Sequence, residues 1–211
     1  MLITRRHLVA GGAALVGVAA AAGAQKLVPT SGQDMGPFYP VVRPADEDAD
    51  LTRVRGAKGV ATGEPINVIG RVLDLKGNPV RGARIELWQA NAVGRYDHPG
   101  DVCADAALDP NFQGYALVTS DRDGHFKFRT IKPGAYSIPG DMRTPHIHFD
   151  IHGRAERLVT QLYFPGEPLN ERDLILRNAT PRESVIAKAL PRLSGDPGAL
   201  AFRWDVVLAF G

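Results

Sequence analysis

Short runs of alternating apolar and polar residues, separated by turn signals, constrain the fold of this chain most. Such runs cover 66–74, 83–89, 114–120, 125–130, 135–138, 146–151, 159–164 and 202–210. Alternation with a period of two is typical of strands buried on one face, and the Gly, Pro, Asn and Asp between the runs are typical of turns. Glycine (23) and proline (16) make up about 18% of 211 residues, against roughly 12% in average usage. The sequence therefore predicts an all-β fold, a β-sandwich.

The sequence also predicts a short helix over residues 182–190 and a long loop over residues 90–113. Loops of that length in compact domains are usually functional or disordered. The only cysteine, Cys103, falls in this loop and has no partner for an internal disulfide.

The first 24 residues have the layout of an export signal. Arg5 and Arg6 precede an apolar run over 8–24 that ends in small residues, Ala22 and Ala24. The adjacent arginines predict a twin-arginine export signal, and hence a periplasmic or extracellular protein. The run is rich in Ala and Gly, so no membrane span is expected in the mature form. A plain N-terminal helix or anchor is the alternative.

Removing residues 1–24 also changes the charge balance. The chain has 25 basic and 23 acidic residues, and the signal holds two of the basic ones and no acid. The mature part is then neutral, which gives no support for a nucleic-acid partner. The predicted organisation is a signal over 1–24, an irregular N-terminal arm over 25–62, and a β-sandwich catalytic domain over 63–211. The aromatic residues of the arm, Phe38 and Tyr39, require a surface to pack against.

Two histidines two residues apart, His146 and His148, point to one face of a predicted strand. Neighbouring neutral imidazoles are well placed to bind a metal ion. Tyr96 and Tyr136 could add phenolate oxygens, which are hard ligands and favour ferric iron over zinc or copper(I). His152 has the same spacing but lies at the expected strand end, so we predict no ligand role for it. His98 and His125 are expected to face solvent.

The order of several motifs resembles the intradiol ring-cleavage dioxygenases, and most of all the β-subunit type of protocatechuate 3,4-dioxygenase. The similarity runs from about residue 32 to 208. The segments that carry it are G36-P-F-Y-P40, I85-E-L-W-Q-A-N-A-V-G-R-Y-D-H98, L108-D-P-N-F-Q-G114, F128-R-T-I-K-P-G-A-Y136, R143-T-P-H-I-H-F149 and T160-Q-L-Y-F164.

This resemblance implies a transthyretin-like (prealbumin-like) sandwich with long active-site loops and a bound Fe(III). It implies Tyr96, Tyr136, His146 and His148 as the metal ligands. Arg143 and Gln161 would line the substrate pocket, and Arg143, Tyr136 and Gln161 would take part in catalysis. The implied reaction cleaves a catechol ring between the two hydroxyl-bearing carbons with O2, and gives a cis,cis-muconate-type diacid. A homo-oligomer, or a hetero-oligomer with an α-type chain, is the implied assembly.

One position departs from the protocatechuate enzymes. They carry a tryptophan shortly after the axial tyrosine, where this chain has Ile138, so the resemblance does not define which catechol is the substrate.

Two other functions remain open at this point. The segments 70–87 and 119–136 also resemble metal-free transthyretin-like binding modules, which do not account for the clustering of His146, His148, Arg143 and Gln161. A zinc hydrolase built on the two histidines lacks a carboxylate base at a suitable spacing.

Overall fold

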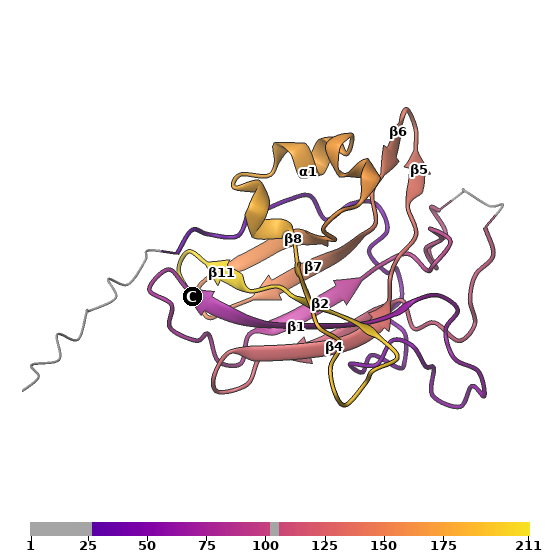
Figure 1. Ribbon diagram of the computed structural model, residues 1–211, viewed down its shortest axis with the longest axis horizontal. Helices are drawn as coiled ribbons and strands as arrows, with labels where there is room; N and C mark the ends of the chain where they lie inside the picture. The colour runs from indigo at the N-terminus through magenta and orange to yellow at the C-terminus, as the bar shows by residue number, and fades with distance from the viewer. Residues whose placement is uncertain (1–26, 102–105) are drawn as a thin grey trace, which may run out of the picture.

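Two β-sheets pack face to face around an apolar core (Figure 1). The computed structural model describes residues 27–101 and 106–211. The predicted export signal and Cys103 lie outside these ranges. The predicted β-sandwich is confirmed.

The five-stranded sheet is organised around its longest strand, β1. One edge of β1 pairs antiparallel with β4, and the other edge pairs in parallel first with β10 and then with β11. The last strand, β9, pairs antiparallel with β10. The bounds of these strands are Pro65–Asp74 for β1, His125–Ile131 for β4, Lys188–Leu190 for β9, Leu200–Arg203 for β10 and Val206–Leu208 for β11.

The four-stranded sheet has the order β3-β2-β7-β8 and is antiparallel throughout. Its strands are β2 (Arg84–Trp88), β3 (Tyr115–Thr119), β7 (His146–His152) and β8 (Arg157–Tyr163). The inner face carries the apolar residues of each alternation, such as Leu87, Ile147 and Phe149, which have no exposed surface. These residues and their partners from the five-stranded sheet form the main core.

The remaining elements are short and lie above β8 and β7 in Figure 1. They are the hairpin β5–β6 (Tyr136–Ile138 and Asp141–Arg143), the 3₁₀ turns η1 (Pro168–Glu171) and η2 (Arg182–Val185), and the helix α1 (Leu174–Asn178). The sequence did not predict β6, η1 or α1, because three to five residues are too few to display a period. Among the described residues, no helix is long and apolar enough to span a membrane.

Two expectations about the C-terminal part were wrong. Residues 182–190 form the turn η2 followed by strand β9, not one helix. The predicted strand 202–210 is divided into β10 and β11, which keep one register on β1. They are interrupted at residues 204–205, where the Asp205 side chain accepts a hydrogen bond from Arg71 N (3.1 Å). The break lies beside Gly70, where a side chain would collide with the carbonyl oxygen of Trp204.

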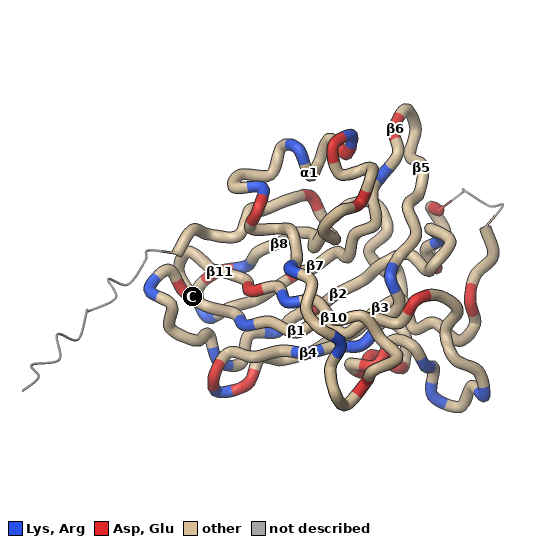
Figure 2. The backbone as a smooth tube through the Cα atoms, in the orientation of Figure 1, with Lys and Arg blue, Asp and Glu red and all other residues tan. Residues whose placement is uncertain are grey.

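The N-terminal arm crosses the outer face of the four-stranded sheet. Its first described residues are bonded to one strand of each sheet, with Gln33 N donating to Val159 O of β8 (2.8 Å) and Thr30 N donating to Val207 O of β11 (2.9 Å). Polar side chains on this face are therefore buried. Basic and acidic residues are interspersed over the described part of the molecule (Figure 2).

Candidate metal centre

The four predicted ligands, which come from three parts of the chain, lie together in the structure. His146 and His148 lie on β7, with their Nε2 atoms 3.1 Å apart. The Tyr136 hydroxyl, from the first residue of β5, is 3.3 Å from His146 Nε2. The Tyr96 ring lies edge-on to that of Tyr136, with centroids 5.3 Å apart. All four side chains are buried, with 7% or less of their surface exposed.

Tyr96 is positioned by the tight loop after β2. The Asn91 side chain accepts hydrogen bonds from the backbone N–H groups of Val93 and Arg95, each at 3.0 Å. The Tyr96 N–H donates to Asp101 Oδ2 at 2.7 Å. These bonds fix the loop backbone, so Tyr96 projects inward from a segment without regular structure.

Electrostatics keep the two imidazoles neutral. Burial lowers the pKa of His146 and of His148 well below 6.5, and the nearby Arg143 charge acts in the same direction. A neutral imidazole offers a lone pair to a metal, as a protonated one cannot. Burial also raises the pKa of Tyr96 and of Tyr136, so both phenols hold their protons in the absence of a metal.

Two buried polar atoms at this centre have no hydrogen-bond partner among the described residues. They are the Tyr96 hydroxyl and His148 Nδ1. An unsatisfied buried polar atom costs about 1–3 kcal/mol, and such groups in native proteins call for an explanation. Two imidazole nitrogens and two phenol oxygens, with no thiolate, form a donor set that fits a hard, highly charged cation such as ferric iron.

Arg143 and Gln161 lie beside these residues and touch each other. Arg143 sits directly opposite Tyr136 in the β5–β6 hairpin. Its Nη2 donates to Gln161 Oε1 at 2.6 Å, and its Nε donates to Asp173 Oδ2 at 2.8 Å. Burial lowers the pKa of Arg143, but interactions with the Tyr163 phenol and the Asp173 carboxylate outweigh this effect and raise it. The guanidinium therefore stays charged inside the protein.

Asp173 was not predicted as part of the site. It is fully buried, and its Oδ1 caps α1 by accepting from Ile175 N and Leu176 N at 3.1 and 3.0 Å. The aspartate before L174-I-L is a recognisable N-cap signal, but nothing local indicates that its other oxygen pairs with Arg143.

An aromatic cluster surrounds the centre on its arm side. Trp88 stacks on His148, and the arm residues Phe38 and Tyr39 pack against Tyr96 and Trp88 respectively. Ile138, which stands near the position of the tryptophan in the protocatechuate enzymes, packs against the same cluster.

The other histidines of the described residues make different contacts. His125 is exposed and His98 is partly buried in the loop beside Phe38. His152, at the end of β7, pairs with Asp150 at 3.1 Å.

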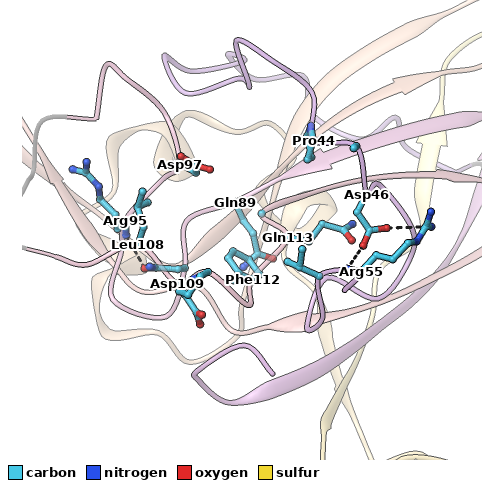
Figure 3. Close-up of a pocket in the computed structure, with 15 residues that line it drawn as sticks. Pro44, Asp46, Arg55, Gln89, Arg95, Asp97, Leu108, Asp109, Phe112 and Gln113 are labelled. Carbon is cyan, nitrogen blue, oxygen red and sulfur yellow. Dashed lines mark hydrogen bonds and ion pairs between the residues drawn. The ribbon is translucent and has the colours of Figure 1, made fainter. Parts of the chain in front are cut away.

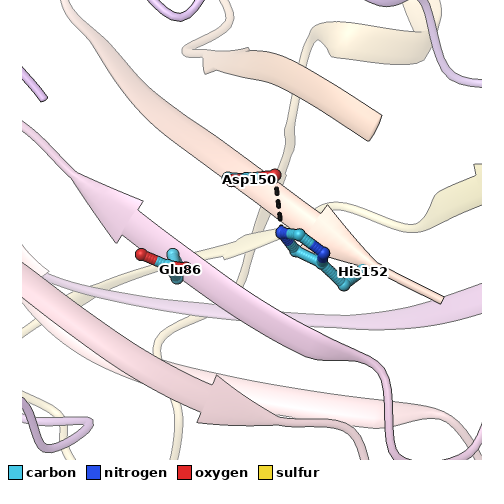
Figure 4. Close-up of side chains that lie close together, drawn as sticks. All are labelled: Glu86, Asp150 and His152. Carbon is cyan, nitrogen blue, oxygen red and sulfur yellow. Dashed lines mark ion pairs between the residues drawn. The ribbon is translucent and has the colours of Figure 1, made fainter. Parts of the chain in front are cut away.

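Glu86, Asp150 and His152 form a second group with metal-ligand chemistry (Figure 4). The carboxylates of this group already have protein partners. Asp150 accepts two 2.9 Å hydrogen bonds from Arg157, and Glu86 pairs with Arg43 and Arg84. We assign this group to structure, because arginines supply the positive charge that a metal would bring.

A cavity of about 620 Å³ is lined by Arg95 and Asp97, the two neighbours of Tyr96 in the sequence (Figure 3). The arm and the loop after β2 line it, including the Asp46–Arg55 ion pair and Arg95. None of the four predicted ligands contributes to its wall, so it is separate from the metal centre.

Comparison with known proteins agrees with this geometry. A dioxygenase family model matches residues 35–210. The protocatechuate 3,4-dioxygenase beta chain of Burkholderia cepacia is 43% identical over 184 residues, which cover 83% of this chain and 74% of that protein. A hydroxyquinol 1,2-dioxygenase of Rhodococcus opacus is 32% identical over 82% of this chain, but only 62% of the longer relative is covered.

The chain is also similar to the solved structure of a dioxygenase domain. The dioxygenase domain of a carbohydrate-binding fusion protein from Streptomyces sp. SirexAA-E is 30% identical, with a TM-score of 0.64. The alignment covers 86% of this chain and 99% of that one. The chain belongs to the intradiol ring-cleavage dioxygenase family.

Proposed function

We propose that this protein is a non-haem Fe(III) intradiol dioxygenase. Its reaction would break the ring bond between the two hydroxyl-bearing carbons of a catechol and place both atoms of O2 in a cis,cis-muconate-type diacid. The observation that carries the proposal is the buried convergence of His146, His148, Tyr136 and Tyr96, with the two Nε2 atoms 3.1 Å apart. These four residues would hold the iron. Bound there, ferric iron would supply a Lewis acid that holds the substrate oxygens and the redox chemistry with O2.

Tyr136 has the position and chemistry of a proton acceptor. Its hydroxyl lies at the centre of the site, and Arg143 stands directly opposite it in the hairpin. As a phenolate, Tyr136 could take one proton from a catechol hydroxyl at its own oxygen. The nearby guanidinium lowers the pKa of Tyr136, although burial raises it by more.

Arg143 would stabilise negative charge on the substrate. It is buried, stays charged and is held by Asp173 and Gln161, so its guanidinium is already oriented before substrate arrives. Gln161 Nε2 also donates to Asp34 O at 3.1 Å, which fixes the amide that Arg143 contacts. We therefore assign Gln161 to the pocket wall and to the orientation of Arg143.

The substrate is a catechol-type aromatic whose ring substituents are undefined. The Burkholderia relative is named for protocatechuate and the Rhodococcus relative for hydroxyquinol. Ile138 lies in the aromatic cluster beside Tyr136, where a small apolar side chain leaves more room than an indole. Protocatechuate, catechol, hydroxyquinol and larger plant-derived phenolics are all candidates.

We further propose that the protein is exported through a twin-arginine signal over residues 1–24 and that it acts as an oligomer. The similarity to a beta chain supports an α-type partner chain, and a homo-oligomer is the alternative.

A visible absorption spectrum of the purified, iron-loaded protein tests this function. We expect a tyrosinate-to-iron(III) band that shifts when a catechol is added without O2, and a muconate-type product when O2 is admitted. Tyr136→Phe should keep the fold, change the band and reduce turnover sharply. A protein that stays colourless after incubation with iron(III) would exclude the ferric site and leave the metal-free binding module as the best function.

A further inference from the structure

The two histidines of the centre are held in different ways. His146 Nδ1 lies 2.6 Å from Thr144 O, and this hydrogen bond fixes the orientation of its ring. His148 Nδ1 has no such partner within the described part of the chain. Metal-binding histidines are usually oriented by a hydrogen bond at the second ring nitrogen, so His148 needs another source of orientation.

Packing against Trp88 supplies that orientation. Trp88 and His148 are directly opposite on β2 and β7, and their rings stack with centroids 5.1 Å apart and planes 8° from parallel. Trp88 is 1% exposed, and its own Nε1 also lacks a hydrogen bond among the described residues. The indole therefore contributes its flat face, not a donor, to the site.

The N-terminal arm also packs against Trp88. The Tyr39 ring meets the Trp88 ring edge-on at 5.0 Å, and its hydroxyl donates to Glu86 at 2.6 Å. Gly36 of the arm approaches the His148 ring so closely that an added Cβ would lie 2.9 Å from Cε1. Its φ of +74° also lies in a region that favours glycine. The arm thus packs on both Trp88 and His148.

We propose that Trp88, clamped by Tyr39 of the arm, is the positioning residue for His148. Docking of the arm and binding of the metal are then coupled, because both depend on the same stack of rings. By linkage, a metal that orders His148 also stabilises the docked arm. The proposal concerns the site of the proposed function, and one of its readouts needs no metal.

The first readout is chemical modification of the iron-free full chain with diethyl pyrocarbonate, followed by mass spectrometry. In Trp88→Leu we expect His148 to react at least about tenfold faster than in the wild type, while His146, still bonded to Thr144, keeps its rate. Trp88→Phe retains an aromatic face and should restore most of the protection. Phe128→Leu is the matched control, since it removes a buried aromatic ring of the main core and should leave His148 unchanged.

The second readout is release of iron(III) from the loaded full chain to excess chelator. Loss of a partner that orients a ligand typically costs 10–100-fold in metal affinity, so Trp88→Leu should release iron about 10–100-fold faster. Tyr39→Leu should give a smaller change in the same direction and serves if Trp88→Leu does not fold. Iron should also slow hydrogen exchange over residues 36–43 in the wild type, but not in Trp88→Leu.

Unchanged His148 reactivity in folded Trp88→Leu, or in Tyr39→Leu if only that variant folds, would overturn the positioning role. If the wild type binds no iron(III) but His148 still reacts faster in Trp88→Leu than in the wild type, the proposed function is overturned and the positioning role stands.

Discussion

Two ends of one sheet face can be compared directly, because β2 and β7 run through both of them in register. At one end, the metal end, Trp88 lies opposite His148. At the other, the charged end, Glu86 lies opposite Asp150, two residues along the strands. Both ends bury ionisable side chains under the same N-terminal arm. The neutral imidazoles of the metal end lie near the positive charge of Arg143, and one ring nitrogen has no hydrogen-bond partner among the described residues. The carboxylates of the other end are paired with arginines and phenols.

The difference separates a candidate binding site from a structural network on one surface. Burying an ionisable group is costly unless it is paired or stays neutral. At the charged end, hydrogen bonds and ion pairs within the chain offset the cost of burial. At the metal end the groups stay neutral and partly unsatisfied, which is the condition a cation would relieve. Buried acidic and histidine side chains therefore indicate a cation site more strongly when they lack protein partners than by their presence alone.

The largest expected effect comes from removing a ligand at the metal end. His148→Gln should lower iron(III) affinity by more than about 100-fold, because it removes a ligand and not only a residue that orients one. Iron content after dialysis against a chelator measures this. Stoichiometric iron in the dialysed variant would remove His148 from the centre.

The second prediction concerns the buried ion pair behind the metal end. Asp173→Asn should lower the free energy of unfolding by about 3–5 kcal/mol, because it leaves the buried Arg143 charge without its partner. Denaturation by urea measures this. Asp196→Asn is the matched control, since its pair with Arg129 is partly exposed and should contribute no more than about 1 kcal/mol. Equal losses in the two variants would show that Asp173 has no special role.

At the charged end, Asp150→Asn should reduce stability and leave the metal in place. Arg157 is half exposed and can turn to solvent, so the expected loss is only about 1–2 kcal/mol. Iron content and urea denaturation of the same preparation measure the two quantities. A large loss of iron from this variant would break the distinction between the two ends.

The smallest effect is a pH dependence of stability from Glu86. Burial raises the pKa of this carboxyl, but hydrogen bonds from Tyr39 and Tyr115 outweigh burial and hold it below the usual 4.5. Its stabilising contribution is therefore complete above about pH 4.5 and is lost as the pH falls further, by at most about 1.4 kcal/mol per pH unit. Urea denaturation between pH 6 and pH 3 should show a shallower slope in Glu86→Gln. An identical slope would assign the acid sensitivity to other carboxylates.

The sequence by itself determined most of the strands and the identity of the candidate ligands. Alternation is a local property, so β1, β2, β3, β4, β7 and β8 could be placed from neighbouring residues alone. His146 and His148 follow from the same alternation. Tyr96 and Tyr136 could be named as possible phenolate ligands, but family resemblance was needed to place them with the histidines, because nothing near them in the sequence indicates that their rings lie together.

The tertiary structure alone decided which side chains share an environment. Arg143 pairs with Asp173 across 30 positions of the chain, and Tyr39 reaches Glu86 across 47. The last strand is interrupted between β10 and β11 at the point where Trp204 lies against Gly70 of β1. Burial and hydrogen bonding between distant segments are properties of the packed chain, and no local pattern of residue types encodes them.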